Sequence, residues 1–261
     1  MDQEQIRELA VRKNLEAEVY AQYKTIGSKL RNTIRTKDAR DGETTFIPVG
    51  NGPAYRQPVE CPMADYYFGN WVKKIDDLYF NATEMIVIAK AGAYAIGRKT
   101  DELIIDAMSG ADRRVVVNGG LDQSAINMAM AGDRRAEYAR GAGEWFAVVG
   151  WKQWSDLFNI HEFANADYVS SDELPWKSTQ AKIWLNTLWM PSSGLPKING
   201  VRTCFWYHKA AVGHAIGEQV FTDITRHSGG YHVAWFVNHR LAHGACLIDA
   251  AGVVAIKCKE E

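Results

Sequence analysis

The residues best suited to chemistry are the histidines near the end of the chain, but their spacing does not build a site. They are His208, His214, His227, His232, His239 and His243. His239 and His243 are four residues apart, a spacing that binds metal from one face of a helix. The surrounding sequence predicts strands, which would hold the two side chains about 13 Å apart. We therefore expect no metal and no cofactor, and a metal-dependent enzyme is the weaker alternative.

Other catalytic signatures are missing from the sequence. It has no G-x-S-x-G elbow, no phosphate-binding loop and no H-E-x-x-H helix, because His161-Glu162 is followed by Asn165. The cysteines form no C-x-x-C pair, which predicts reduced thiols and no zinc site. They are Cys61, Cys204, Cys246 and Cys258. We therefore expect that the protein is not an enzyme.

A basic segment is the second candidate. Its members are Lys24, Lys29, Arg31, Arg35, Lys37 and Arg40, against the single acidic residue Asp38. Such clusters contact phosphates, so these side chains are candidates to face packaged DNA. No aromatic residues are interleaved with them as in a dedicated nucleic-acid reader. Contacts to the carboxylates of a neighbouring subunit, or a solvated face, are the alternatives.

The composition is typical of a folded globular protein. Hydrophobic residues make up 47% and charged residues 23% of the 261 residues, and the formal net charge is -1. So small a net charge permits copies to associate. The apolar run at residues 85–89 ends at Lys90, far short of the roughly 20 residues of a membrane helix. The polar start of the chain predicts no signal peptide, and we expect no membrane partner.

Two elements dominate the first third of the chain. Residues up to about 31 predict a helix, because an apolar stripe recurs at helical spacing through Val19, Tyr23, Ile26 and Leu30. Whether it docks on its own chain or on a neighbour stays open. Residues 32–80 then hold four prolines within fifteen positions around a glycine-rich turn, Gly50-Asn51-Gly52. They predict a long open hairpin that buries its apolar side chains only against another subunit.

The clearest element is a helix over residues 83–108, about 40 Å long. Asn81 is its expected N-cap and Gly110 its stop signal. Its first half is apolar nearly all round, which predicts burial on several sides. Further along, we expect a helix at 122–138, a buried strand at 144–150, a helix at 152–158, a loop-rich stretch at 172–200 and short strands to the end.

The order of these parts resembles the major capsid proteins of tailed bacteriophages, in the group of short chains without a fused scaffold domain. The residues that carry the resemblance are YKTIGSKLRNTI at 23–34, YAIGR at 94–98 and DELII at 101–105 within the long helix, WYHKAAVGHAIG at 206–217, FTDIT at 221–225 and VVAIKC at 253–258. Each is a packing pattern, and their common order is the specific feature. No lysine and asparagine that would cross-link neighbours is identified.

The resemblance implies an α+β chain with the Hong Kong 97-like fold. Its parts would be an N-terminal arm at 1–31, an extended loop at 32–72, a peripheral domain at 73–114 and 213–261 with the long helix as its spine, and an axial domain at 115–212. The loop would lie across an adjacent subunit.

The implied function is a major capsid protein that self-assembles, as hexamers and pentamers, into an icosahedral shell around phage DNA. Expected partners are further copies of the chain, double-stranded DNA bound without sequence preference, a portal protein, and scaffold or decoration proteins. The expected location is the virion, after assembly in the host bacterial cytoplasm. An encapsulin-like, non-viral shell of the same fold is the alternative.

Overall fold

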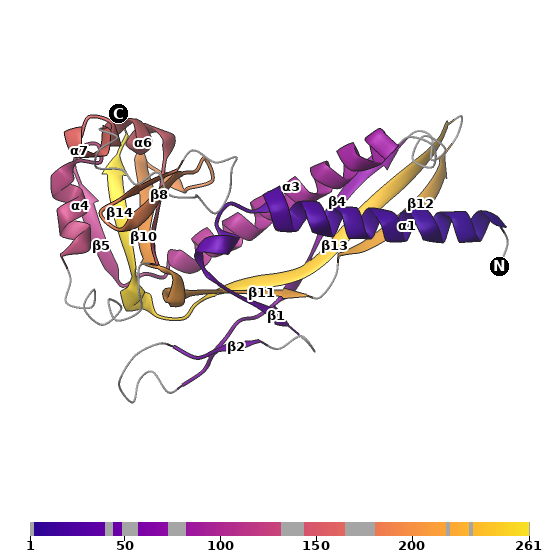
Figure 1. The fold of residues 1–261 in the computed structure, drawn as a ribbon, viewed down its shortest axis with the longest axis horizontal. Coiled ribbons are helices and arrows are strands. Elements are labelled where there is room, and N and C mark those ends of the chain that lie inside the picture. Colours follow the sequence, from indigo (N-terminus) through magenta and orange to yellow (C-terminus); the bar gives the residue numbers. More distant parts are fainter. Residues whose placement is uncertain are drawn as a thin grey trace.

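The computed structural model describes residues 3–39, 44–48, 57–72, 82–131, 144–164, 181–217, 220–229 and 232–260. Figure 1 shows an elongated subunit with helices and strands gathered into two lobes. The described chain contains both helices and strands along its length, so the predicted α+β class is confirmed. Four predictions lie outside the described residues: the turn at Gly50-Asn51-Gly52, the N-cap Asn81, Arg40, and the second half of the helix at 122–138.

The first lobe is a sheet with two helices on one face. Among the described residues the sheet has five strands, of which β4 pairs with β13 and the others follow the order β1-β11-β13-β12. The bounds are β1 Arg35–Ala39, β4 Ala64–Val72, β11 Val212–Gly217, β12 Phe221–Gly229 and β13 His232–Leu247. Helices α1 (Gln3–Gln22) and α3 (Ala82–Met108) cover one face, side by side (Figure 1).

Strand β13 organises this sheet, because its 16 residues pair with three other strands. Alternate side chains point to the helices: Val237, His239, Leu241 and His243 are all buried. The strand surroundings predicted for His239 and His243 are thus confirmed. The predicted first helix is also confirmed, and it ends in a π-helical turn, η1 (Tyr23–Gly27).

The second lobe is a larger sheet packed with short helices. In the part of the chain that the structure describes, the strand order is β5-β14-β10-β6-β8-β7, and β9 pairs with β10. The strands are β5 Arg113–Val117, β6 Trp145–Val149, β7 Lys182–Trp184, β8 Thr187–Pro191, β9 Lys197–Ile198, β10 Val201–His208 and β14 Val253–Lys259. The helices are α4 Gln123–Met130, α6 Trp151–Leu157 and α7 His161–Ala164.

Two details of this lobe differ from the predictions. The stretch at 172–200 was expected to be loop-rich because of its prolines, yet β8 lies within it and is buried throughout, with Pro191 at its end. The expected peripheral domain included all of residues 213–261, whereas β14 pairs with β10 and β5 in the second sheet. Only pairing over long sequence distances places β14 there, and local sequence does not report such pairing.

Helix α3 joins the two lobes. Its N-terminal half packs in the core of the first lobe through Ala89, Ala93 and Ile96. Its C-terminal half packs in the core of the second lobe through Ile104 and Met108. The expected burial of the first half on several sides is wrong within one subunit, because three large side chains remain exposed. They are Ile86, Val87 and Tyr94.

Two short turns also link the lobes. One is η5 (Lys209–Ala211), between β10 and β11, and the other is η6 (Ala250–Gly252), between β13 and β14. The two turns are in contact. The backbone N–H groups of Ile248 and Asp249 both donate to the carbonyl oxygen of Ala211, at 2.8 and 3.1 Å. The two chain connections between the lobes are therefore hydrogen-bonded to each other.

Candidate assembly surfaces

The N-terminal arm is fixed to its own chain by a close crossing of two glycines. The backbone of Gly27, at the end of η1, lies directly on Gly97 in α3, and a Cβ on Gly97 would overlap the Gly27 carbonyl oxygen. Leu15, Val19 and Tyr23 are buried in the core beside this crossing. The open question of where the first helix docks is answered: it packs on its own body.

Asp101 holds the chain that leaves the arm. Its carboxylate accepts hydrogen bonds from the Ser28 hydroxyl at 2.6 Å and from the backbone N–H groups of Leu30 and Lys29 at 3.0 and 3.2 Å. Burial raises the pKa of Asp101, and these donors act in the opposite direction. The arm is therefore bound through a partly buried acidic group on α3.

A chain of buried hydrogen bonds continues from the arm into the sheet. The Thr100 hydroxyl donates to the carbonyl of Ile96 at 3.0 Å, so its oxygen is left to accept. Tyr23 Oη lies 2.9 Å and His243 Nδ1 3.2 Å from that oxygen. Both must then donate to it, which places the proton of neutral His243 on Nδ1. Arm, spine helix and β13 are thereby joined by one hydroxyl.

The buried histidines of the first lobe pack against one another and against Thr222. His214 and His243 meet edge to face, with ring centroids 5.8 Å apart, and Thr222 Oγ1 lies 2.9 Å from His239 Nδ1. Burial lowers the pKa of His239 and His243 to about 4 and that of His214 to about 3. In the described residues, no three histidine, cysteine or carboxylate side chains are arranged to hold a metal ion.

The other late histidines lie apart from this group. His208 accepts a hydrogen bond from the backbone N–H of Ala210 at 3.1 Å, in the second lobe. His227 is exposed on the opposite face of the first sheet, and the side chain of His232 lies outside the described residues. The structure thus separates a set that looked like one cluster in the sequence.

The basic segment is divided into two groups by the fold. Lys24 and Lys29 are exposed beside the helical layer; the Lys24 ammonium lies over the Tyr20 ring, 4.4 Å from its centroid. Arg31 donates to the carbonyl of Lys24 at 3.0 Å. Arg35 and Lys37, on β1, instead donate to hairpin carbonyls, as described next. Arg40 lies outside the described residues.

The root of the hairpin is anchored on its own subunit. Strands β2 (Thr45–Phe46) and β3 (Val59–Glu60) pair antiparallel, and Arg35 and Lys37 donate to the carbonyls of Ile47 and Thr45 at 2.7 and 3.3 Å. The Phe46 ring is buried against Gly213. The expectation that this region buries apolar side chains only on a neighbour is thus wrong for the root, where β11 and β13 supply a small core. Ile47, next to it, remains 65% exposed.

The face of the first sheet that lies opposite the helices carries an exposed aromatic patch. Tyr67 and Trp71 on β4 are 63% and 62% exposed. The Trp71 ring contacts Phe236 and His227, with centroids 4.9 and 5.2 Å away. The Phe236 ring covers Gly69, where no side chain would fit. Exposed aromatic side chains grouped on a sheet face are typical of an interaction surface.

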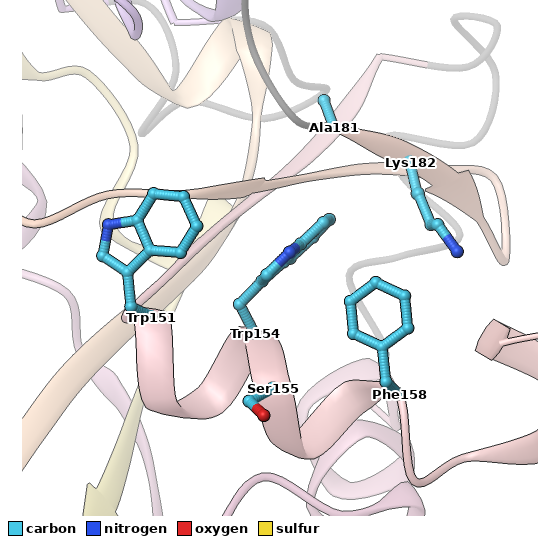
Figure 2. A pocket seen from close by; sticks show the side chains of 6 residues that line it. All are labelled: Trp151, Trp154, Ser155, Phe158, Ala181 and Lys182. Atoms are coloured by element: carbon cyan, nitrogen blue, oxygen red, sulfur yellow. The ribbon is translucent and has the colours of Figure 1, made fainter.

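A second aromatic surface lies at the edge of the other sheet. A groove of about 510 Å³ runs between α6 and the start of β7. Figure 2 shows Trp151 and Trp154 on α6, and Phe158 directly after it, in a row along the groove, with Lys182 reaching toward Phe158 from the other side. The Lys182 ammonium lies 4.5 Å from the Phe158 ring centroid. Aromatic side chains such as these are enriched in protein interfaces.

Several of these residues lie in segments that were noted in the sequence, but no role was predicted for them. Gly27, Gly97 and Asp101 belong to the segments that carry the family resemblance, but their contact joins positions about seventy residues apart. The aromatic patch had a weak signal, since Tyr67 and Trp71 keep the even spacing of side chains on one face of a strand. The groove on α6 had no recognised signal.

None of the described helices is both long enough and apolar enough to span a bilayer.

Comparison with known proteins gives a family and a fold. A family profile described as phage capsid protein matches residues 49–260. No curated protein matches the chain in sequence. Among solved structures, the virus-like particle from Pyrococcus furiosus is similar with a TM-score of 0.60 at 12% identity, covering 94% of this chain and 98% of that one.

Two further solved structures have the same fold, with similar TM-scores and sequence identities. The capsid of Ralstonia phage GP4 has a TM-score of 0.59 at 11% identity, with 88% of this chain and 87% of that chain covered. The encapsulin complex from Synechococcus elongatus has a TM-score of 0.60 at 11% identity, with the same two coverages, 88% and 87%. The fold alone is therefore common to viral and non-viral shells, whereas the family profile is that of phage capsids. Because this profile spans most of the sequence, the chain belongs to the phage capsid protein family and has the Hong Kong 97-like fold.

Proposed function

We propose that this major capsid shell protein tiles the icosahedral head of a tailed phage by placing its hairpin on an adjacent copy. The observation that carries the proposal is the division of the hairpin: its root is bound to its own sheet, while Ile47 beside it is exposed. A neighbouring copy offers exposed apolar surface for it, such as the patch of Tyr67 and Trp71. Burial of such side chains stabilises by about 25 cal/mol per Å².

The finer assignments follow the same outline. Residues 1–31 would serve as the arm, 32–72 as the extended loop, and the first and second lobes as the peripheral and axial domains, with β14 counted in the latter. Hexamers and pentamers would form through contacts between second lobes. Closed symmetry with many repeated contacts makes a stable shell from weak interfaces.

Lys24 and Lys29 are the members of the basic segment best placed to meet packaged double-stranded DNA, because both are exposed. Arg35 and Lys37 are already engaged with hairpin carbonyls and fit a role in holding the hairpin. Portal, scaffold and decoration proteins would be further partners, and assembly would take place in the host bacterial cytoplasm. The role is structural and not catalytic.

The test is to shorten the hairpin without disturbing its root. Phe46 pairs with Val59, so continuing the register puts Pro48 opposite Gln57, and Asn-Gly in place of residues 49–56 would close a two-residue turn. We expect a folded subunit with an unchanged Tm that forms no shells in negative-stain microscopy. The matched control replaces residues 49–56 by eight glycine and serine residues, which keeps the length and removes the side chains. Normal shells from the shortened chain would contradict the proposal.

A further inference from the structure

All four cysteines are buried free thiols, and each interacts with one other cysteine. Cys204 and Cys258 lie on the adjacent strands β10 and β14 and are completely buried. The other pair is placed differently. Cys61 belongs to the root of the hairpin, directly after β3, and Cys246 lies near the end of β13. A bond between them would therefore join the hairpin to the sheet.

The backbone brings Cys61 to Cys246. Residues 61–63 cross over β13, where the Pro62 carbonyl oxygen rests on Gly244 so closely that a Cβ there would overlap it. Cys246 is two residues further and so points to the same face as Gly244. The Cys61 N–H donates to the carbonyl of Thr44 at 2.8 Å, which fixes the crossing segment to the other side of the hairpin.

The two thiols share one small core. Cys61 is 2% and Cys246 8% exposed, and both pack with Phe46, Ala215 and Ile248. A hydrogen bond from the Cys246 S–H to the Cys61 sulfur lowers the pKa of Cys61, and burial acts against this effect. The same bond raises the pKa of Cys246. The two sulfurs are therefore neighbours within this core.

We propose that Cys61 and Cys246 are a cross-link site at which a low-molecular-weight disulfide, such as oxidised glutathione, closes a disulfide that fastens the hairpin root to β13. The purpose of this cross-link rests on the proposed function, in which the hairpin holds a neighbouring copy. Its formation does not depend on that function. A reducing cytoplasm keeps the pair open, and an oxidising medium outside the cell closes it.

The chemistry balances without a metal or an enzyme. When the hairpin root opens locally and exposes Cys61, its thiolate attacks the oxidised glutathione, the S–S bond of the reagent breaks, and one glutathione thiolate leaves. Cys246 then loses its proton and attacks Cys61 in the mixed disulfide, releasing the second glutathione. The two cysteines lose two electrons and two protons in total, and the reagent is reduced to two glutathione thiols.

The experiment measures the linkage directly in the full-length protein. The protein is purified with reductant, one half is exposed to oxidised glutathione, free thiols are blocked with N-ethylmaleimide, and peptides are mapped by mass spectrometry without reduction. We expect a Cys61–Cys246 peptide pair within one chain and a Tm raised by about 5–10 °C, because the closed loop is long. Microscopy of the same sample records shells separately. The linkage lies within one chain, so it is tested even where no shells form.

The variants Cys61→Ala and Cys246→Ala should each lose the rise in Tm, compared with the same variant before oxidation. Cys204→Ala is the matched control, since it also removes a buried cysteine from a thiol pair but should keep the rise. A map that shows only glutathionylated or unreacted Cys61 after oxidation would overturn the proposal. So would an equal rise in Tm for Cys61→Ala.

Discussion

Mild acid should unfold the isolated subunit through its buried histidines. His214, His239 and His243 are 0% exposed, and their pKa values lie at about 3, 4 and 4 in the folded protein. An unfolded histidine has a pKa of about 6.5. Between these values the unfolded chain binds protons that the folded chain does not, so stability is complete above about pH 7 and falls as the pH falls toward 4.

The size of the effect follows from these values. From pH 7 to pH 5 each of the three histidines should remove about 2 kcal/mol of unfolding free energy, or about 6 kcal/mol together. Typical domains have only about 5–15 kcal/mol in all. Urea unfolding of unassembled subunits, followed by tryptophan fluorescence at pH 5, 6 and 7, measures this loss.

His214→Leu isolates one contribution. Neither ring nitrogen of His214 has a hydrogen-bond partner among the described residues, so an apolar side chain of similar size loses no bond there. We expect the variant to lose about 2 kcal/mol less than the native chain between pH 7 and pH 5. The effect of titrating groups that both proteins share, including Asp101, cancels in this comparison. The exposed His161 supplies the control variant, His161→Leu. An equal loss in His214→Leu and the native chain would refute the reasoning.

Three more predictions concern the arm and the aromatic patch. Gly97→Ala should destabilise the subunit by about 3 kcal/mol in urea unfolding, because its Cβ overlaps the Gly27 carbonyl; unchanged stability would contradict the crossing. Asp101→Asn should cost about 2 kcal/mol in the same assay, since three donors lose a charged acceptor. Trp71→Ser should leave subunit stability within about 1 kcal/mol but lower shell yield in sedimentation. Full yield would show that this exposed ring makes no contact between copies.

Elements with strong local signals could be predicted from the sequence. The long helix had an apolar pattern without prolines between an expected N-cap and a glycine stop signal, and the structure places it at Ala82–Met108. The buried strand at Trp145–Val149 was likewise predicted from its apolar run. In both cases the residues that decide the element lie within the element itself.

Features formed by distant contacts could not be predicted in this way. Whether the first helix stays on its own chain depends on Gly97 and Asp101, far along the sequence from Gly27. The hairpin root is buried because it packs on β11 and β13. The prolines of the segment predict an extended chain but not this contact. The hydrogen bonds of Arg35 and Lys37 also depend on carbonyls of the hairpin root, which only the fold brings near.

The shared helix α3 sets how such a subunit can respond to strain. Each of its ends is embedded in a different core, and a sharp bend between the lobes would have to break hydrogen bonds within the helix. A closed polyhedron nevertheless demands unequal angles around its five-fold and six-fold positions. Rigid subunits of this kind meet that demand at the contacts between them. Differences in curvature should therefore appear between neighbouring subunits and not within any one subunit.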